Sequence, residues 1–151
     1  MAAATIKPTI LLVPGSFGSS ALAYDKVATG LRSQGYDVIC IELRTVGPPS
    51  TGPAATMEDD AAYIHGIAEK LCDEGKDVVI AMSSYGGVPG TEACKSLVKK
   101  ERQAEGKKGG VMALVYLTAM LIPEGFSLAE AFAPEQSPLD YVKVDVSDYP
   151  F

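Results

Sequence analysis

The chain has 151 residues, of which 47% are apolar, and this is enough to form one domain with a packed core. The formal net charge of -6 at pH 7 argues against nucleic acid as a partner, because proteins that bind phosphates carry basic surfaces. The longest apolar run, 111–122, falls well short of the roughly 20 residues that cross a bilayer, so we expect no membrane span. Residues 1–151 are therefore expected to form a single domain.

Cysteine usage and the amino-terminal segment indicate a reducing compartment. Cys40, Cys72 and Cys94 lie far apart, are odd in number, and lack the paired spacing of a zinc site or a disulfide framework. Residues 1–8 lack the charged region and the long apolar core of a secretory signal. We expect a cytoplasmic protein that uses no metal and no cofactor.

Patterns typical of strands and of helices alternate along the chain. Short apolar runs predict buried strands, and apolar residues spaced three and four apart predict helices between them. The expected strands are 9–13, 37–43, 77–82 and 111–117, and the expected helices are 21–33, 57–72 and 87–103. This alternation predicts the α/β fold class, as a three-layer sandwich around a mostly parallel sheet with functional loops at the carboxyl ends of the strands.

The turn after the third expected strand carries the clearest functional signal. The apolar run 78–82 leads through Ser83 into Ser-Tyr-Gly-Gly at 84–87, and a helical pattern follows. A strand that ends in Ser-x-Gly before a helix lifts a serine hydroxyl onto a sharp turn at the edge of a sheet. Ser84 is therefore the candidate nucleophile, and a serine that caps the following helix is the alternative. Ser83 is disfavoured because Tyr85, and not glycine, stands two residues after it.

Three segments in this order resemble the α/β-hydrolase fold superfamily: the loop 12–18 after the first strand, the Ser84 turn, and 121–125 at the exit of the fourth strand. The resemblance covers residues 8–135 and is to the N-terminal portion of serine hydrolases of the esterase type. It implies a partial α/β-hydrolase fold in which 119–151 are a lid fragment and an irregular tail. In the family the acid and the histidine of the triad follow the nucleophile, so we expect this sequence to be truncated before both.

The resemblance also implies an oxyanion hole. The expected donors are the backbone N–H of Tyr85 and one N–H from the first loop, that of Ser16 or else that of Phe17, aimed at the charge that develops on the carbonyl oxygen. The alternative reading of this loop is a plain glycine-rich connection between a strand and a helix.

Two residues depart from the family pattern. Met82 stands two residues before the candidate nucleophile, where the family usually has glycine, so we expect the neighbouring backbone to make room for its side chain. Pro14 stands where the family usually has a histidine that braces the first loop.

The chain offers few groups that could activate a serine. Its single histidine, His65, falls in the middle of an expected helix before the serine, and we do not expect it to come within hydrogen-bond reach of Ser84. Asp59 and Asp60 are adjacent near a helix start, where neighbouring side chains do not face one another, and both are expected to be solvated.

Two functions follow from these residues. The first is a serine hydrolase that acts on an ester-like carbonyl bond of a small molecule, in small-molecule metabolism. The alternative is a truncated hydrolase-like protein that binds a ligand or a partner, or has no activity, because a serine hydroxyl without a base is a weak nucleophile at neutral pH.

The expected partners are a small-molecule substrate and a second copy of the chain. The fourth strand, 111–117, is expected to be an exposed apolar edge, and such an edge pairs readily with another chain. Self-association through this strand is therefore predicted.

Overall fold

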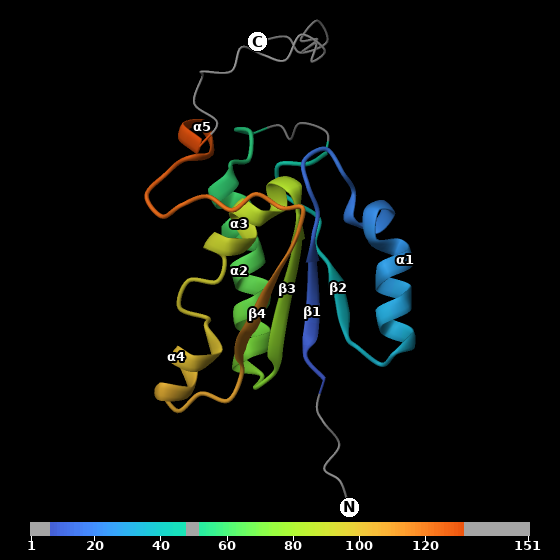
Figure 1. The fold of residues 1–151 in the computed structure, drawn as a ribbon, viewed down its shortest axis with the longest axis vertical. Helices are drawn as coiled ribbons and strands as arrows, with labels where there is room; N and C mark the ends of the chain where they lie inside the picture. The colour runs from blue at the N-terminus through green and yellow to red at the C-terminus, as the bar shows by residue number, and fades with distance from the viewer. Residues whose placement is uncertain (1–6, 48–51, 132–151) are drawn as a thin grey trace, which may run out of the picture. The chain divides into compact units, whose positions relative to one another are not determined.

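The structure is a computed structural model, and it describes residues 7–47 and 52–131. Four strands form one parallel sheet in the order β2-β1-β3-β4 (Figure 1). The strands are β1 (Thr9–Val13), β2 (Val38–Cys40), β3 (Asp77–Ser83) and β4 (Gly110–Leu117). The helices are α1 (Ser20–Ser33), α2 (Met57–Asp73), α3 (Gly87–Glu92), α4 (Lys99–Ala104) and α5 (Leu128–Ala131), with a 3-10 helix, η1 (Ser84–Gly86), after β3.

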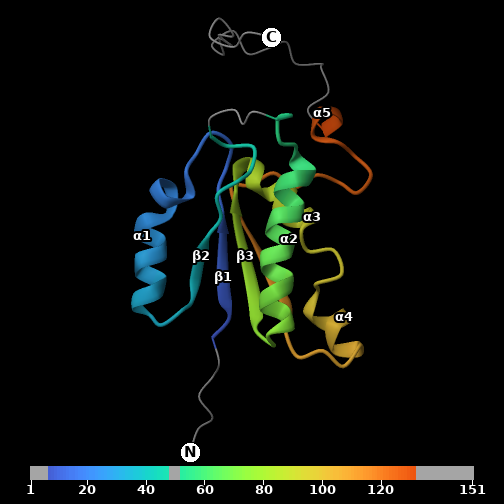
Figure 2. The ribbon, with the colours of Figure 1, turned by 180° about the vertical axis from the view of Figure 1, so that it is seen from behind.

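The strand order places α1 and α2 on opposite faces of the sheet. The chain moves from β1 outward to β2 and then back across β1 to β3, and right-handed crossovers in opposite directions put their helices on opposite faces. Figures 1 and 2 show α1 at the β2 end of the sheet and α2 and α3 toward the β4 end. The direction in which successive strands are added to the sheet reverses between β1 and β3, and open parallel sheets bind ligands beyond the carboxyl ends of their strands at such a point.

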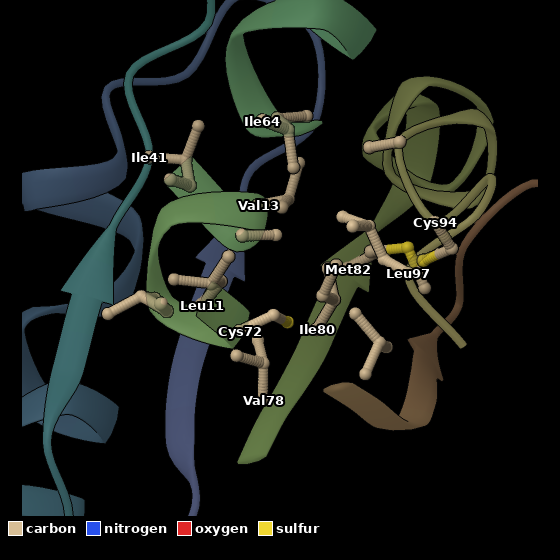
Figure 3. Packing of buried hydrophobic residues seen from close by; sticks show 14 of the residues in the cluster. Leu11, Val13, Ile41, Ile64, Cys72, Val78, Ile80, Met82, Cys94 and Leu97 are labelled. Atoms are coloured by element: carbon tan, nitrogen blue, oxygen red, sulfur yellow. The ribbon is translucent and has the colours of Figure 1, made fainter. Parts of the chain in front are cut away.

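Alternate residues of β1 pack in two separate hydrophobic cores, one on each face of the sheet. Leu11 and Val13 pack in one cluster with Ile64 of α2, whereas Leu12 packs in the other with Tyr24 of α1. Figure 3 shows the first cluster, in which β1, β3 and α2 converge. The prediction of an α/β fold with a parallel sheet between two helical layers is thus confirmed.

The second strand is shorter than predicted. The sequence pattern predicts a strand over 37–43, but β2 covers only Val38–Cys40. Because β2 is an edge strand that pairs with β1 alone, it ends where β1 turns away after Val13. Ile41 and Leu43 are nevertheless buried, which is why their pattern resembles that of a strand.

The helix predicted over 87–103 is two helices. After α3 the backbone turns, Ser96 takes a left-handed φ of 62°, and the helical path stops there. Leu97 then enters the core, and Val98 forms an isolated bridge with Val111 on the outer side of β4. The apolar residues that suggested one long helix therefore come from a helix and from a segment that returns to the sheet.

Residues from Ile122 onward form a second compact unit, described here by itself up to Ala131. The amide of Phe126 donates to the carbonyl of Pro123 at 3.1 Å, and α5 follows. Ser127 and Glu130 form a capping box at the start of α5: the Ser127 amide donates to the Glu130 carboxylate at 2.7 Å, and the Glu130 amide donates to the Ser127 hydroxyl at 3.1 Å. Among the described helices, none has the length and apolar character needed to cross a membrane.

Candidate active site

Ser84 lies on a strained turn at the carboxyl end of β3. Its φ is 48°, a left-handed conformation that non-glycine residues rarely adopt, and the residue is exposed. Its carbonyl accepts a hydrogen bond of 2.8 Å from the amide of Met120, just past β4. The turn therefore presents the Ser84 side chain at the sheet edge while its backbone is fixed from the β4 side.

The two glycines after Tyr85 allow the turn to pack against its neighbours. A Cβ on Gly86 would lie 2.3 Å from the Pro14 carbonyl oxygen, and a Cβ on Gly87 would lie 2.1 Å from the Met120 carbonyl oxygen. Both distances are far below van der Waals contact with a backbone atom that cannot move aside. Gly86 and Gly87 are thus required by the close approach of the loop after β1 and of the exit from β4.

The loop after β1 lies directly beside Ser84. A Cβ on Gly15 would lie 2.9 Å from the Ser84 Cβ and 3.4 Å from its Oγ. Next along the loop come Ser16 and then Phe17, which is fully exposed and has a left-handed φ of 63°. The Tyr85 amide falls in the first turn of η1, where N–H groups have no partner within the helix. The structure thus places the loop that carries Ser16 beside the turn that carries Ser84 and Tyr85.

The Ser83 side chain contacts α1. Its Oγ is 2.7 Å from the hydroxyl of Tyr24 on α1, and the same hydroxyl donates to the Val13 carbonyl at 2.9 Å. The side chain is therefore engaged on the α1 face of the sheet. This geometry agrees with the preference for Ser84 over Ser83.

Met82 is accommodated by a glycine of α3. Its side chain is completely buried on the α2 and α3 face of the sheet, where Figure 3 shows it beside Cys94 and Leu97. A Cβ on Gly90 would lie 2.5 Å from the Met82 Sδ and 2.8 Å from its Cγ. The methionine is therefore paired with a helical glycine, and the glycine in Val-Pro-Gly at 88–90 is the sequence signal that could have identified its partner.

The expectation that Asp60 is solvated is wrong. Asp60 has no exposed surface, and its carboxylate accepts hydrogen bonds from the amides of Arg44 and Thr45, from the Thr45 hydroxyl and, at 3.1 Å, from the Tyr85 hydroxyl. Asp59, in contrast, is exposed and caps α2 through Thr56. A first-turn pair divides in this way because adjacent helical residues face different directions, one toward solvent and one toward the sheet.

The Tyr85 phenol is held in its neutral form. Burial, followed by the charge of the neighbouring Asp60 carboxylate, raises the pKa of Tyr85 to about 12. The phenol therefore stays protonated throughout the physiological range, and its hydroxyl donates a hydrogen bond to Asp60.

His65 is held away from the turn. Its Nδ1 is 2.9 Å from the Ala93 carbonyl oxygen, which can only accept, so Nδ1 carries the proton; its Nε2 faces Glu69 at 3.9 Å. His65 also lines a cavity of about 390 Å³ with Glu58 and Glu92, and Ser84 does not line that cavity. Among the described residues, no hydrogen bond joins His65 to Ser84.

The buried cysteines are not placed for chemistry. Cys72 and Cys94 are free thiols inside the core, and burial raises the pKa of Cys94 to about 12, so its thiolate does not form at neutral pH. In the described part of the chain, no group of three or more histidine, cysteine or acidic side chains is arranged to hold a metal ion.

Comparison with known proteins agrees with the fold. The sequence profile of the Alpha/beta hydrolase family matches residues 10–150. The chain is 36% identical over 135 residues to "Probable hydrolase R7" of a Phoma species, covering 89% of this chain and 52% of that protein. It is 29% identical over 129 residues to "Alpha/beta hydrolase nvfD" of Aspergillus novofumigatus, covering 85% of this chain and 50% of that protein.

The chain therefore belongs to the alpha/beta hydrolase family, as the resemblance predicted. It spans about half the length of the curated relatives that it matches.

Proposed function

We propose that this chain is a serine hydrolase whose nucleophile is Ser84 and whose substrate is a small molecule with an ester-like carbonyl bond. The observation that carries the proposal is the placement of an exposed, strained Ser84 with its Oγ beside the Gly15 loop, at the carboxyl ends of β1 and β3. Membership of a hydrolase family and two relatives that are named as hydrolases support it.

In the proposed reaction the Ser84 Oγ forms a bond to the carbonyl carbon while the carbonyl π electrons move to the oxygen. The backbone N–H groups of Tyr85 and Ser16 donate to that oxygen and stabilise its negative charge. Collapse of the tetrahedral intermediate breaks the bond to the leaving group, which takes a proton as it departs and leaves an acyl group on Ser84. Water then attacks the acyl carbon and regenerates the serine.

This sequence of steps needs a base that accepts the Ser84 proton. His65 is the single histidine of the sequence; its Nδ1–H donates to the Ala93 carbonyl, and its other ring nitrogen, Nε2, faces Glu69 and makes no hydrogen bond to Ser84. We therefore assign the base to a histidine outside these 151 residues, on another segment or on a partner chain. The exposed Phe17 on the loop beside Ser84 favours a modestly hydrophobic substrate. The free thiols support a reducing compartment, and so the cytoplasm.

A second candidate is a hydrolase-like protein that binds a ligand without turning it over. The same observation on His65 favours it, because a serine hydrolase without its base keeps only the roughly 10³ to 10⁴-fold acceleration that the oxyanion hole and substrate binding supply. In this case Ser84 contributes a binding surface and no covalent intermediate.

The deciding experiment is labelling with a fluorophosphonate probe in buffers of increasing imidazole concentration, with the modified residue mapped by mass spectrometry. Free imidazole supplies the base that the chain lacks, so labelling at Ser84 should accelerate with its concentration. Ser84→Ala should abolish the labelling, and the neighbouring Ser83→Ala should leave it. A folded protein that does not label at any imidazole concentration would reject the nucleophile and favour the second candidate.

A further inference from the structure

The reaction steps above do not use Asp60, although it is the most completely buried charged group near the turn. Its relative exposure is 0% and its two oxygens accept from the amide of Arg44 at 2.5 Å, the amide and hydroxyl of Thr45 at 3.1 and 2.7 Å, and the Tyr85 hydroxyl at 3.1 Å. A buried carboxylate is stable only when hydrogen bonds of this kind replace water. Asp60 is therefore fixed in place, and it fixes the groups that donate to it.

Through these bonds Asp60 joins three segments that are distant in the sequence. It belongs to the start of α2, Arg44 and Thr45 follow β2, and Tyr85 follows β3. Both of the latter segments leave the sheet at its carboxyl edge, which is the edge that carries Ser84. The position of the Asp60 carboxylate thus links the exit of the edge strand to the turn of the candidate nucleophile.

Tyr85 is the residue whose backbone matters most for the proposed chemistry. Its N–H is one of the two proposed oxyanion donors, and the peptide bond that contains this N–H begins at the strained Ser84. A left-handed non-glycine residue persists only where the surroundings hold it. The Ser84 carbonyl is held by the Met120 amide, and Gly86 is held against Pro14, whereas the Tyr85 side chain is tied from the α2 side by Asp60.

The charge of Asp60 would act against catalysis if it reached the reacting carbonyl. A carboxylate near a developing oxyanion repels it, so an electrostatic role predicts that neutralising Asp60 speeds the reaction. A role in holding Tyr85 predicts the opposite sign, because the donor would lose its alignment. The sign of the effect therefore separates the two roles.

We propose that Asp60 is a positioning residue: by binding the Tyr85 hydroxyl it holds the Tyr85 backbone N–H in line with Ser84 for oxyanion stabilisation. This inference rests on the proposed function of Ser84. It adds a site residue that lies 24 positions before the nucleophile in the sequence and on a different element.

The test is the rate of fluorophosphonate labelling at Ser84, with imidazole present and corrected to the folded fraction of each variant. Tyr85→Phe removes the hydroxyl alone, and Asp60→Asn removes the charge. Each should slow labelling at least about tenfold, since small displacements of an aligned group have effects of this order or larger. The double variant should be no slower than the slower single variant, because both changes break the same link.

Two matched controls separate positioning from a general structural effect. Asp59→Asn makes the same charge change at the exposed neighbour. Tyr116→Phe removes another part-buried phenol hydroxyl, which is 2.7 Å from the Thr91 hydroxyl on α3. Both controls should label within about twofold of the unsubstituted protein, while Tyr85→Phe and Asp60→Asn do not.

The outcomes of this experiment distinguish the inference from the proposed function. If the unsubstituted chain labels and all four variants label equally, the role of Asp60 is rejected and the nucleophile stands. If the unsubstituted chain does not label, the proposed function fails, and amide hydrogen exchange over 83–87 decides the inference. Faster exchange there in Tyr85→Phe than in Tyr116→Phe supports the hold on the turn, and equal exchange overturns it.

Discussion

The turn after β3 and the neighbouring strand β4 are packed very differently. The turn is enclosed by the loop after β1, by the exit of β4, by α3 and by the Asp60 carboxylate. On β4, the residues paired with Val79, Ala81 and Ser83 face the α1 side of the sheet, but α1 covers only the other strands. Of these, Val115 and Leu117 are exposed, and so is Met112, which lies at the register shift of β4 and pairs with no residue of β3.

The difference teaches which part of the site this chain assembles by itself. Every contact that fixes Ser84 and Tyr85 comes from the described residues of the sheet, its loops and α2. The apolar strip of β4 (Met112, Val115 and Leu117) has no such cover among those residues. The turn of Ser84 is thus built by the described residues, and we propose that a second copy of the chain joins at β4.

The largest effect of a glycine substitution is expected from Gly87→Ala. The added methyl group would meet the Met120 carbonyl oxygen, a backbone atom, so the turn or the β4 exit must shift, at a cost of about 3 kcal/mol in the free energy of unfolding. Urea denaturation measures this cost. Gly66→Ala in α2 is the control, because nothing lies within 4 Å of its new methyl group and alanine favours the helix by about 1 kcal/mol. Equal effects of the two changes would contradict the tight packing of the turn.

A smaller effect is expected from Gly90→Ala, because the group that it meets is the flexible end of Met82. We expect a loss of about 1 to 2 kcal/mol from overpacking. Met82→Ala alone should cost more, about 2 to 5 kcal/mol, through the cavity that it leaves.

In the double variant the alanine at 90 would occupy part of the space of the lost methionine. The two losses should therefore add to more than the loss of the double variant, with a coupling of about 1 kcal/mol or more in the unfolding free energies. Simple additivity of the two changes would show that Met82 and Gly90 do not share this space.

A pH-dependent loss of stability is expected from the buried Cys94 thiol. Burial raises the pKa of the Cys94 thiol from 9.0 to about 12, so the unfolded chain releases this proton before the folded one. The stabilising contribution is therefore complete below pH 9 and is lost as the pH rises from about 9 to about 12. Unfolding measured at several alkaline pH values should show a shallower decline for Cys94→Ala than for the unsubstituted chain. An unchanged slope would contradict the burial of this thiol.

The smallest effect on stability, and a clear one on association, is expected from Leu117→Lys. Leu117 is 45% exposed on β4, so the free energy of unfolding should change by no more than about 0.5 kcal/mol. We expect the chain to self-associate through β4, and the introduced charge should reduce this association in light scattering. Leu22→Lys on α1, where the leucine is 86% exposed, is the matched control and should leave it. A monomeric unsubstituted chain would contradict the prediction.

Much of the fold follows from local sequence patterns. The predicted strand 9–13 and helix 57–72 agree with β1 and α2 to within one residue, because each has a clear pattern and a clear stop signal. The split of 87–103 into two helices could not be predicted in this way, since the apolar spacing of Leu97 and Val98 reflects a return to the sheet that only tertiary packing defines.

The parts of the candidate site that are adjacent in the sequence could be predicted, and the contacts between residues distant in the sequence could not. Ser84 and Tyr85 are consecutive and follow a strand, so the motif alone indicates them. Asp60 contacts Tyr85 from a position far away in the sequence, and its first-turn location suggests a solvated residue. The Met82 and Gly90 pair has the same character: the sequence indicates that Met82 needs space, but only the packing of β3 against α3 shows that Gly90 provides it.

The most direct test of the account is amide hydrogen exchange of the 151-residue chain, resolved over peptides from β3 with its turn and from β4. At a dilution at which the chain is monomeric, we predict slow exchange over 78–87, where both sides of the strand and the turn are enclosed, and markedly faster exchange over 112–117, where the outer edge of β4 is unpaired. Equally slow exchange in the two segments would contradict the claim that the chain encloses the nucleophile turn and leaves β4 open.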